Sequence, residues 1–233
     1  MKPTFVLIHS PLQGPATLAP TRKALEKRGY AVKLPALTPA FAGAGPYYTR
    51  VGQAIGAETT NAGDGVVFVA HGPGGTLTSA AGAASQSPVL GVIFIEATFP
   101  HPGRRWFDTV PIELEDRFKA LAKNGRIPTA FKFTADQESA WKRNLGDSVY
   151  KTLAAEQTEL PLEFFNEKAP PNDALRNVQI GYIQLRPGDA NHDDAAWMRW
   201  RTKQLDCKGS FPTMTDADKV AEAIEALSKE LVP

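Results

Sequence analysis

The sequence predicts an α/β protein built on a mostly parallel, doubly wound sheet. Continuous apolar runs are typical of strands buried on both faces, and segments with helical periodicity alternate with them. The clearest runs are residues 5–9, 66–69 and 90–96. Glycine-rich turns end the strands sharply, as in Ala70-His71-Gly72-Pro73-Gly74-Gly75. Helices that connect parallel strands cover both faces of such a sheet.

The remaining elements follow in order along the chain. Gly29 ends a helix over residues 18–28, and the next strand covers 30–35. The penultimate strand is expected at 178–185 because its apolar residues alternate. Val220, Ile224, Leu227 and Leu231 form one stripe, which predicts a packed helix near the end of the chain. Helices are expected at 18–28, 47–59, 76–84, 195–203 and 216–231.

Residues 104–175 interrupt this alternation, so we divide the chain into a core of 1–103 and 176–233 and a helical insertion of 104–175. Leu114, Phe118 and Leu121 mark one amphipathic helix of the insertion, and Trp141 belongs to another. Aromatic residues concentrate here. A wide pocket beneath the insertion, with Trp106 and Trp141 as substrate-binding residues, would suit an apolar or aromatic ligand. The alternative, which we favour for most of these aromatic residues, is that they form the insertion's own core.

Composition excludes several classes of protein. The 233 residues are 42% hydrophobic and carry a net charge of +1, which favours one large core and gives no electrostatic reason to bind nucleic acid. Cys207 is the one cysteine, so an internal disulfide or a thiolate metal cluster is excluded. The first apolar run is too short for a secretion signal, and no run reaches transmembrane length. We therefore expect a cytoplasmic protein without a cofactor or metal, and the oligomeric state stays open.

The turn at residues 70–75 resembles the nucleophile elbow of the α/β-hydrolase superfamily, Gly-x-Ser-x-Gly, with Gly72 in place of the serine. An elbow nucleophile sits in a strained left-handed conformation, which glycine adopts almost without cost. Gly72 thus keeps the bend but lacks the atom that forms an acyl-enzyme. The resemblance implies an α/β-hydrolase fold with a small helical cap at residues 104–175, and it makes Gly72 and Pro73 candidate ligand-binding residues.

The opening segment also resembles this superfamily, in which a loop after the first strand supplies half of the oxyanion hole. His9 would brace that loop. Most relatives have glycine after this histidine, whereas Ser10 is similar to the hydroxyl-bearing residue of the hydroxynitrile lyase branch. By this resemblance Ser10 donates a hydrogen bond to a substrate oxygen. The alternative is a serine that satisfies its own loop next to Pro11.

Two carboxylates stand where strands end. Glu96 closes the strand 90–96, where some branches of the superfamily place the catalytic acid, and an apolar cleft would make it an acid or base. Its structural alternative is an ion pair with an arginine such as Arg104. Asp189 matches the usual place of the triad acid, but without a histidine to orient it is equally compatible with a turn. Neighbouring His192, Asp193 and Asp194 indicate a solvated helix start rather than a metal site.

The catalytic histidine of the superfamily is also missing. Where relatives have Gly-Ser-His-x-Pro, this chain has Gly209-Ser210-Phe211-Pro212, so the histidine is either replaced by Phe211 or lost by a one-residue deletion. His71, just before the vacated corner, has two interpretations: a structural residue that points back into the fold, which we favour, or a residue that faces the empty space.

Three hypotheses for function follow. The first is an enzyme that performs acid–base chemistry without a covalent intermediate on a small apolar carbonyl compound, as a lyase, isomerase, cyclase or dehydratase, with Ser10, His71, Glu96 and Asp189 as its candidate groups. The second is a non-catalytic protein that binds a similar ligand. The third is a hydrolase that uses another residue, such as Ser10 or Ser210.

Overall fold

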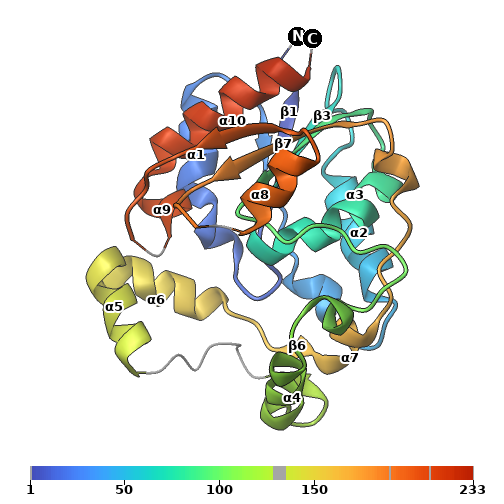
Figure 1. Cartoon of the computed structure of the whole chain (residues 1–233), viewed down its shortest axis with the longest axis vertical. Helices are drawn as coiled ribbons and strands as arrows, with labels where there is room; N and C mark the ends of the chain where they lie inside the picture. The colour runs from blue at the N-terminus through green and yellow to red at the C-terminus, as the bar shows by residue number, and fades with distance from the viewer. Residues whose placement is uncertain (1, 128–134, 189, 210, 233) are drawn as a thin grey trace.

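The computed structural model describes residues 2–127, 135–188, 190–209 and 211–232. Its main sheet has six strands, all parallel, in the order β2-β1-β3-β4-β7-β8 (Figure 1). The strands are β1 (Thr4–Ile8), β2 (Val32–Lys33), β3 (Val66–His71), β4 (Val89–Ile95), β7 (Gln179–Gln184) and β8 (Arg201–Gln204). From β1 the chain runs to one edge and then returns to β3, so the strand order reverses between β1 and β3. Ligands of open α/β sheets bind at the carboxyl ends of strands beside such a reversal.

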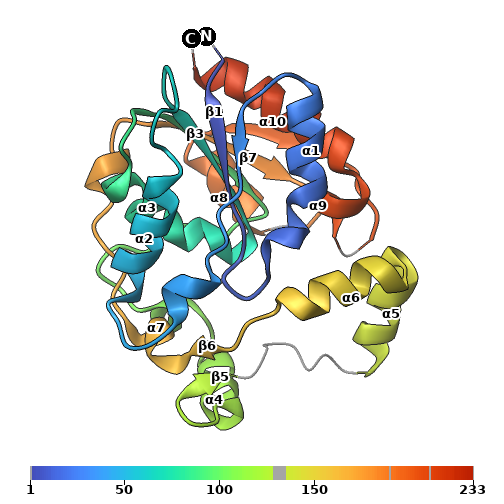
Figure 2. The same cartoon turned by 180° about the vertical axis from the view of Figure 1, so that it is seen from behind.

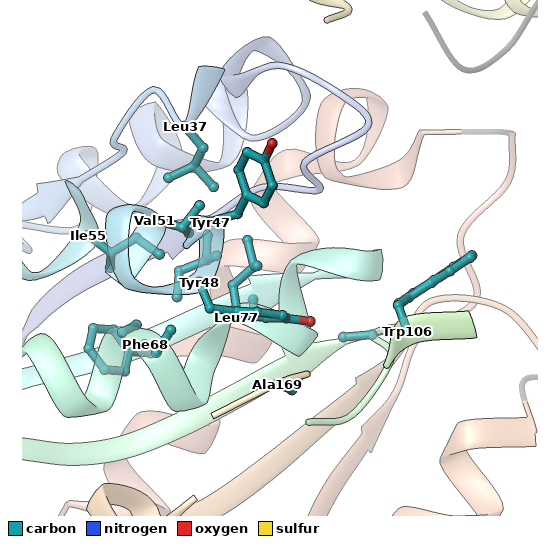
Figure 3. Close-up of a cluster of buried hydrophobic side chains, with 14 of the residues drawn as sticks. Leu37, Tyr47, Tyr48, Val51, Ile55, Phe68, Leu77, Trp106 and Ala169 are labelled. Atoms are coloured by element: carbon teal, nitrogen blue, oxygen red, sulfur yellow. The ribbon is translucent and has the colours of Figure 1, made fainter. Parts of the chain in front are cut away.

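Helices cover both faces of the sheet, as predicted (Figures 1 and 2). Alternate residues of β3 point to opposite faces. Val67 and Val69 belong to a core cluster with α1 (Ala19–Lys27) and α10 (Ala217–Leu231). Phe68 and Ala70 belong to a second cluster with α2 (Tyr47–Ala57) and α3 (Thr78–Ala84). Figure 3 shows the second cluster from the side of α2, with Val51, Ile55 and Leu77 near Phe68.

The approach of α2 to α3 is unusually close because two glycines of α2 face the backbone of α3. A Cβ added at Gly52 would lie 2.5 Å from the carbonyl oxygen of Ala80, and one at Gly56 would lie 2.3 Å from that of Ala84. Small residues of α3, Ala80 and Ala84, therefore meet glycines on the neighbouring helix. This contact fixes the position of α3 and of the turn before it.

Among the residues that the structure describes, 104–175 contribute no strand to the main sheet. The described helices of residues 112–166 lie beyond the carboxyl ends of its strands, whereas residues 173–175 return alongside α3 (Figure 1). A short antiparallel pair joins β5 (Arg126–Ile127) to β6 (Leu160–Pro161). The helices are α4 (Ile112–Leu121), α5 (Ala135–Leu145), α6 (Asp147–Glu156) and α7 (Leu162–Asn166), with single 3-10 turns η4 (Trp106–Thr109) and η5 (Asp173–Leu175). We call residues 104–175 the cap.

The prediction of a helix over residues 195–203 is wrong in its range. The helix α8 covers Ala190–Trp197, and residues 201–204 form the edge strand β8. Arg199 has a φ of +59°, a left-handed conformation that cannot continue an α-helix. Because β8 lies at the edge and is largely polar, it has no apolar run by which the sequence would have revealed it. The remaining elements are α9 (Pro212–Thr215) and the 3-10 turns η1 (Pro15–Thr17), η2 (Thr38–Phe41) and η3 (Gly72–Leu77).

Within the described part of the chain, none of the helices combines the length and the apolar character needed to cross a bilayer.

Candidate functional site

The predicted bend lies between β3 and η3, at the carboxyl edge of the sheet beside the strand reversal. Gly72 has a φ of +55° and begins η3 directly after His71. Its carbonyl oxygen accepts a 3.1 Å hydrogen bond from the amide of Thr98, which follows the neighbouring strand β4. The turn therefore has the backbone of a nucleophile elbow without a nucleophile.

The three glycines of the elbow have different surroundings. A Cβ at Gly74 would lie 2.6 Å from the carbonyl oxygen of Ile8, and one at Gly75 would lie 2.2 Å from that of Thr98. At Gly72 an added Cβ would meet nothing within 4 Å. Gly74 and Gly75 are therefore required for packing, whereas the space above Gly72 is open.

The corner also lacks the donors of an oxyanion hole. In this fold one donor is the amide of the residue after the nucleophile, and the other comes from the loop after the first strand of this motif. Pro73 follows Gly72 and has no N–H. In the loop after β1, Pro11 has none either, and the amides of Leu12 and Gln13 donate to Oγ and to the carbonyl oxygen of Ser10, at 3.2 and 3.0 Å. Both prolines are visible in the sequence, and their lack of an N–H is the signal that could have predicted this loss.

Ser10 and His9 shape this loop. The Ser10 side chain is buried and accepts from its own loop, as the structural alternative for it expects. Nδ1 of His9 lies 2.7 Å from the carbonyl oxygen of Ser10, and Nε2 accepts a 3.4 Å hydrogen bond from the Leu37 amide. Burial lowers the pKa of His9, so its ring is neutral. Neither ring nitrogen is bonded to the Ser10 hydroxyl, so His9 does not activate it.

His71 is the ionisable side chain adjoining the open corner. The residue as a whole is half-buried, but Nδ1 is enclosed and has no hydrogen-bond partner among the described residues. Burial, followed by the positive charge of Arg186 and by His9, lowers the pKa of His71 to about 4. The imidazole is therefore neutral at physiological pH, and a buried polar atom without a partner is unusual enough to require an explanation.

Glu96 has the predicted position at the end of β4, but its partner is Arg186 and not Arg104. Nη2 of Arg186 donates to Oε2 of Glu96 at 2.7 Å, and the Arg186 amide donates to Oε1 at 2.9 Å. Arg104 instead donates to the carbonyl oxygen of Asp108. Glu96 and Arg186, with Pro187 and Gly188, line a polar pocket of about 360 Å³. The carboxylate is thus ion-paired, as its structural alternative requires.

Phe211 lies just before α9, in the loop where the resemblance leads us to expect a catalytic histidine. Its side chain is buried, and its ring makes an edge contact with Trp141 of the cap, with the ring centroids 4.9 Å apart. This contact ties α5 to the loop before α9. Asp189 and Ser210, two further candidate residues, lie outside the described residues.

Trp106 lies in the aromatic core of the cap, as the alternative stated for most cap aromatics expects. It is buried and packs against Phe107, Phe118 and Phe165, with centroid distances from 5.1 to 5.7 Å. In Figure 3 Trp106 lies apart from the side chains of α2. These contacts give Trp106 a packing role.

Sequence reasoning missed a cap carboxylate that reaches the loop after β1. Oε2 of Glu156, at the end of α6, accepts a 2.6 Å hydrogen bond from the amide of Ala16. A Cβ at Gly14 would lie 2.3 Å from that oxygen, so the glycine makes room for the carboxylate. The contact joins residues 140 positions apart, and no local pattern signals it.

These features define the fold as that of the α/β-hydrolases. No protein-family model and no curated protein matches the sequence. Among solved structures, the chain is similar to an extracellular α/β-hydrolase from a Paenibacillus species, described as sharing structural and functional homology with tobacco salicylic acid binding protein 2. That match has a TM-score of 0.73 and 18% identity over 96% of this chain and 98% of the other.

Two further similar structures are enzymes by description. A pyrethroid hydrolase from Sphingobium faniae has a TM-score of 0.73 and 18% identity, covering 98% of each chain. Tomato methylketone synthase I, in complex with 2-tridecanone, has a TM-score of 0.69 and 13% identity, covering 99% of each chain. At these identities the likeness establishes the fold, which hosts many activities.

Proposed function

We propose that this chain is an enzyme that performs acid–base chemistry on a small apolar or aromatic carbonyl compound without forming a covalent intermediate. The observation that carries the proposal is the open space at Gly72 directly after His71, whose enclosed Nδ1 has no partner among the described residues. A ligand oxygen that entered far enough to reach Nδ1 would give the ring the hydrogen bond that it lacks. Reactions of the lyase, isomerase, cyclase or dehydratase type need no acyl-enzyme and are compatible with this arrangement.

The role of His71 follows from its neutral state. A neutral imidazole donates a hydrogen bond to a carbonyl oxygen and so stabilises the negative charge that grows there when an adjacent carbon loses a proton. With a pKa of about 4 the ring is a weak base, so polarisation of the carbonyl is its more effective role. Ser10 is assigned to loop structure, and Glu96 to the polar wall beside the ring.

The apolar class of ligand is supported by two points. The chain is balanced in charge, so it does not attract a highly charged substrate. The methylketone synthase that shares this fold is described in complex with 2-tridecanone, an apolar ketone. A cytoplasmic location is part of the same proposal.

The test is proton exchange into ketones. Purified protein is incubated in D2O with a panel of small aliphatic and aromatic ketones, and NMR follows deuterium entry beside the carbonyl. We expect exchange by the wild type and at least about tenfold slower exchange by His71→Gln, the loss of a positioned polar group. Phe107→Leu, within the cap core, is the control for general damage. Exchange that is equal in wild type and His71→Gln contradicts the proposal.

A second candidate function is binding without turnover. The prolines at 11 and 73 and the ion pair of Glu96 favour it, because they remove donors and a free carboxylate from the corner. Mass spectrometry of molecules retained on the purified protein separates the two: a ketone that binds through His71 but exchanges no proton identifies a binder. The third hypothesis, a hydrolase acting through Ser10, has no base beside the hydroxyl to support it.

A further inference from the structure

Glu96 has a backbone conformation that its side chain does not favour. Its φ is +38°, in the left-handed region that glycine adopts readily and other residues rarely do. The preceding strand β4 pairs with β7, and the Glu96 amide donates a 3.0 Å hydrogen bond to the carbonyl oxygen of Ile183 in β7. Such a conformation persists when surrounding contacts enforce it.

Arg186 supplies these contacts from the end of β7, 90 residues away along the chain. Its amide donates to Oε1 of Glu96 at 2.9 Å, its Nη2 donates to Oε2 at 2.7 Å, and its Nε lies 3.5 Å from Oε1. Both carboxylate oxygens are therefore held by one residue: Oε1 by its backbone amide and Oε2 by its guanidinium, with the longer contact from Nε as the second prong of the arginine fork. Nη1 also reaches the carbonyl oxygen of Gly209, at 3.5 Å.

The same guanidinium acts on the imidazole of the site. His71 ends β3, and it pairs in register with Ile95, the residue before Glu96. Burial is the main cause that lowers the pKa of the His71 ring; the positive charge of Arg186 adds to this effect, and His9 acts in the same direction. Further ionisable groups lie beyond β8: the Cys207 thiol and, around it, the Asp206 and Asp216 carboxylates and the Lys219 ammonium group.

We infer that Arg186 is the positioning residue of this site: it clamps the Glu96 carboxylate across the ends of β4 and β7 and holds its own positive charge at the edge of the sheet where β3 ends in His71. The role of the imidazole rests on the function proposed above, whereas the clamp and the ring's charge are properties of the protein without ligand. Arg186 need not touch the ligand for this role.

The test is a pH titration of the histidine rings by NMR in the absence of ligand. In Arg186→Met we expect the His71 midpoint to rise by at least about half a pH unit, because a nearby positive charge is lost. In Arg186→Lys the charge remains but the fork does not, so the midpoint stays near that of the wild type. Glu96→Gln leaves Arg186 uncompensated, and the midpoint falls.

The matched control is Arg176→Met, which breaks an exposed arginine–aspartate pair of similar length, 2.6 Å to Asp173, away from the site. This control variant should leave the titration midpoint of His71 unchanged. A crystal structure of Arg186→Lys at neutral pH is a second readout, in which Glu96 is expected to return to negative φ. An unchanged His71 midpoint in Arg186→Met overturns the electrostatic part of the inference, and an unchanged Glu96 backbone in Arg186→Lys overturns the clamp.

Failure of these experiments is distinguishable from failure of the proposed function. A wild type that exchanges no ketone proton, while its variants titrate as expected, removes the function and leaves the positioning role of Arg186. If the wild type exchanges ketone protons but the His71 midpoint is the same in all variants, the proposed function stands and the positioning role of Arg186 is removed.

Discussion

The packing positions and the reactive positions of the elbow differ sharply. At Gly74 and Gly75 the backbones of neighbouring segments approach so closely that no side chain fits. At position 72 a side chain has room but is missing, Pro73 has no N–H, and Phe211 has no basic group. The comparison teaches that the bend depends on backbone contacts at Gly74 and Gly75, so it keeps its shape without a side chain at position 72.

The largest expected effect tests whether the missing donor matters. Gly72→Ser combined with Phe211→His restores a nucleophile and a base, but Pro73 still lacks an N–H. We expect negligible ester hydrolysis from this double variant, and a rate about 10²- to 10³-fold higher when Pro73→Ala is added, the usual value of one oxyanion donor. The rate of hydrolysis of a p-nitrophenyl ester by the double and triple variants measures this difference.

Pro73→Ala alone is the control and should stay inactive, because residue 72 still has no hydroxyl. If the double variant already hydrolyses the ester as fast as the triple variant, Pro73 is not what disables the corner.

The next effect concerns packing. Gly75→Ala should lower the free energy of unfolding by about 3 kcal/mol, because its Cβ would lie 2.2 Å from the carbonyl oxygen of Thr98 and the backbone must move. Gly72→Ala should lower the free energy of unfolding by only about 1 kcal/mol. The added Cβ meets no atom within 4 Å, so the loss comes from the positive φ alone. Urea unfolding of both variants measures the difference. Equal losses would show that packing does not distinguish the two positions.

An intermediate effect depends on pH. Because the pKa of His71 is about 4 in the folded protein and 6.5 for an unperturbed histidine, the unfolded chain binds a proton first as pH falls. Stability attributable to His71 is therefore complete above pH 6.5 and declines toward pH 4, by about 2 kcal/mol between pH 6.5 and 5. Urea unfolding of wild type and His71→Gln across this range should give a smaller pH slope for the variant. His9 and His101, whose pKa values are also lowered, remain in both.

The smallest effect concerns the cap. Glu156→Ala removes a charge-assisted hydrogen bond to the Ala16 amide and should destabilise the protein by about 1 kcal/mol. The Ala16 amide should also exchange faster with deuterium, because it loses its acceptor. Glu159→Ala, which removes a more exposed carboxylate 3.8 Å from Arg126, is the control and should leave this amide unchanged.

The fold and the elbow were predictable because their signals are local. Apolar runs mark the central strands, and three glycines within four residues mark the bend. The edge strand β8 was missed because an edge strand needs no continuous apolar run. The effect of the prolines at 11 and 73 was also predictable, since the absence of an N–H is a property of the residue itself.

The partners of the site residues were not predictable in the same way. Arg186 meets Glu96 because β4 and β7 are neighbours in a particular register, and Arg104, which is nearer in the sequence, points elsewhere. Glu156 reaches Ala16 only because the cap docks on the loop after β1. Such contacts depend on tertiary arrangement, for which a single sequence gives no pattern.

A second cap carboxylate shows that the insertion is part of the framework. Helix α2 begins after Pro46 and has no side-chain cap of its own. The Glu167 carboxylate, just after α7, fills this need: its two oxygens accept from the amides of Tyr47 and Tyr48 at 2.7 and 3.0 Å. A protein shortened by excising residues 104–175 would leave these amides bare at the start of a helix that braces the elbow. Trimming the insertion to widen access to the corner should therefore stop short of residue 167.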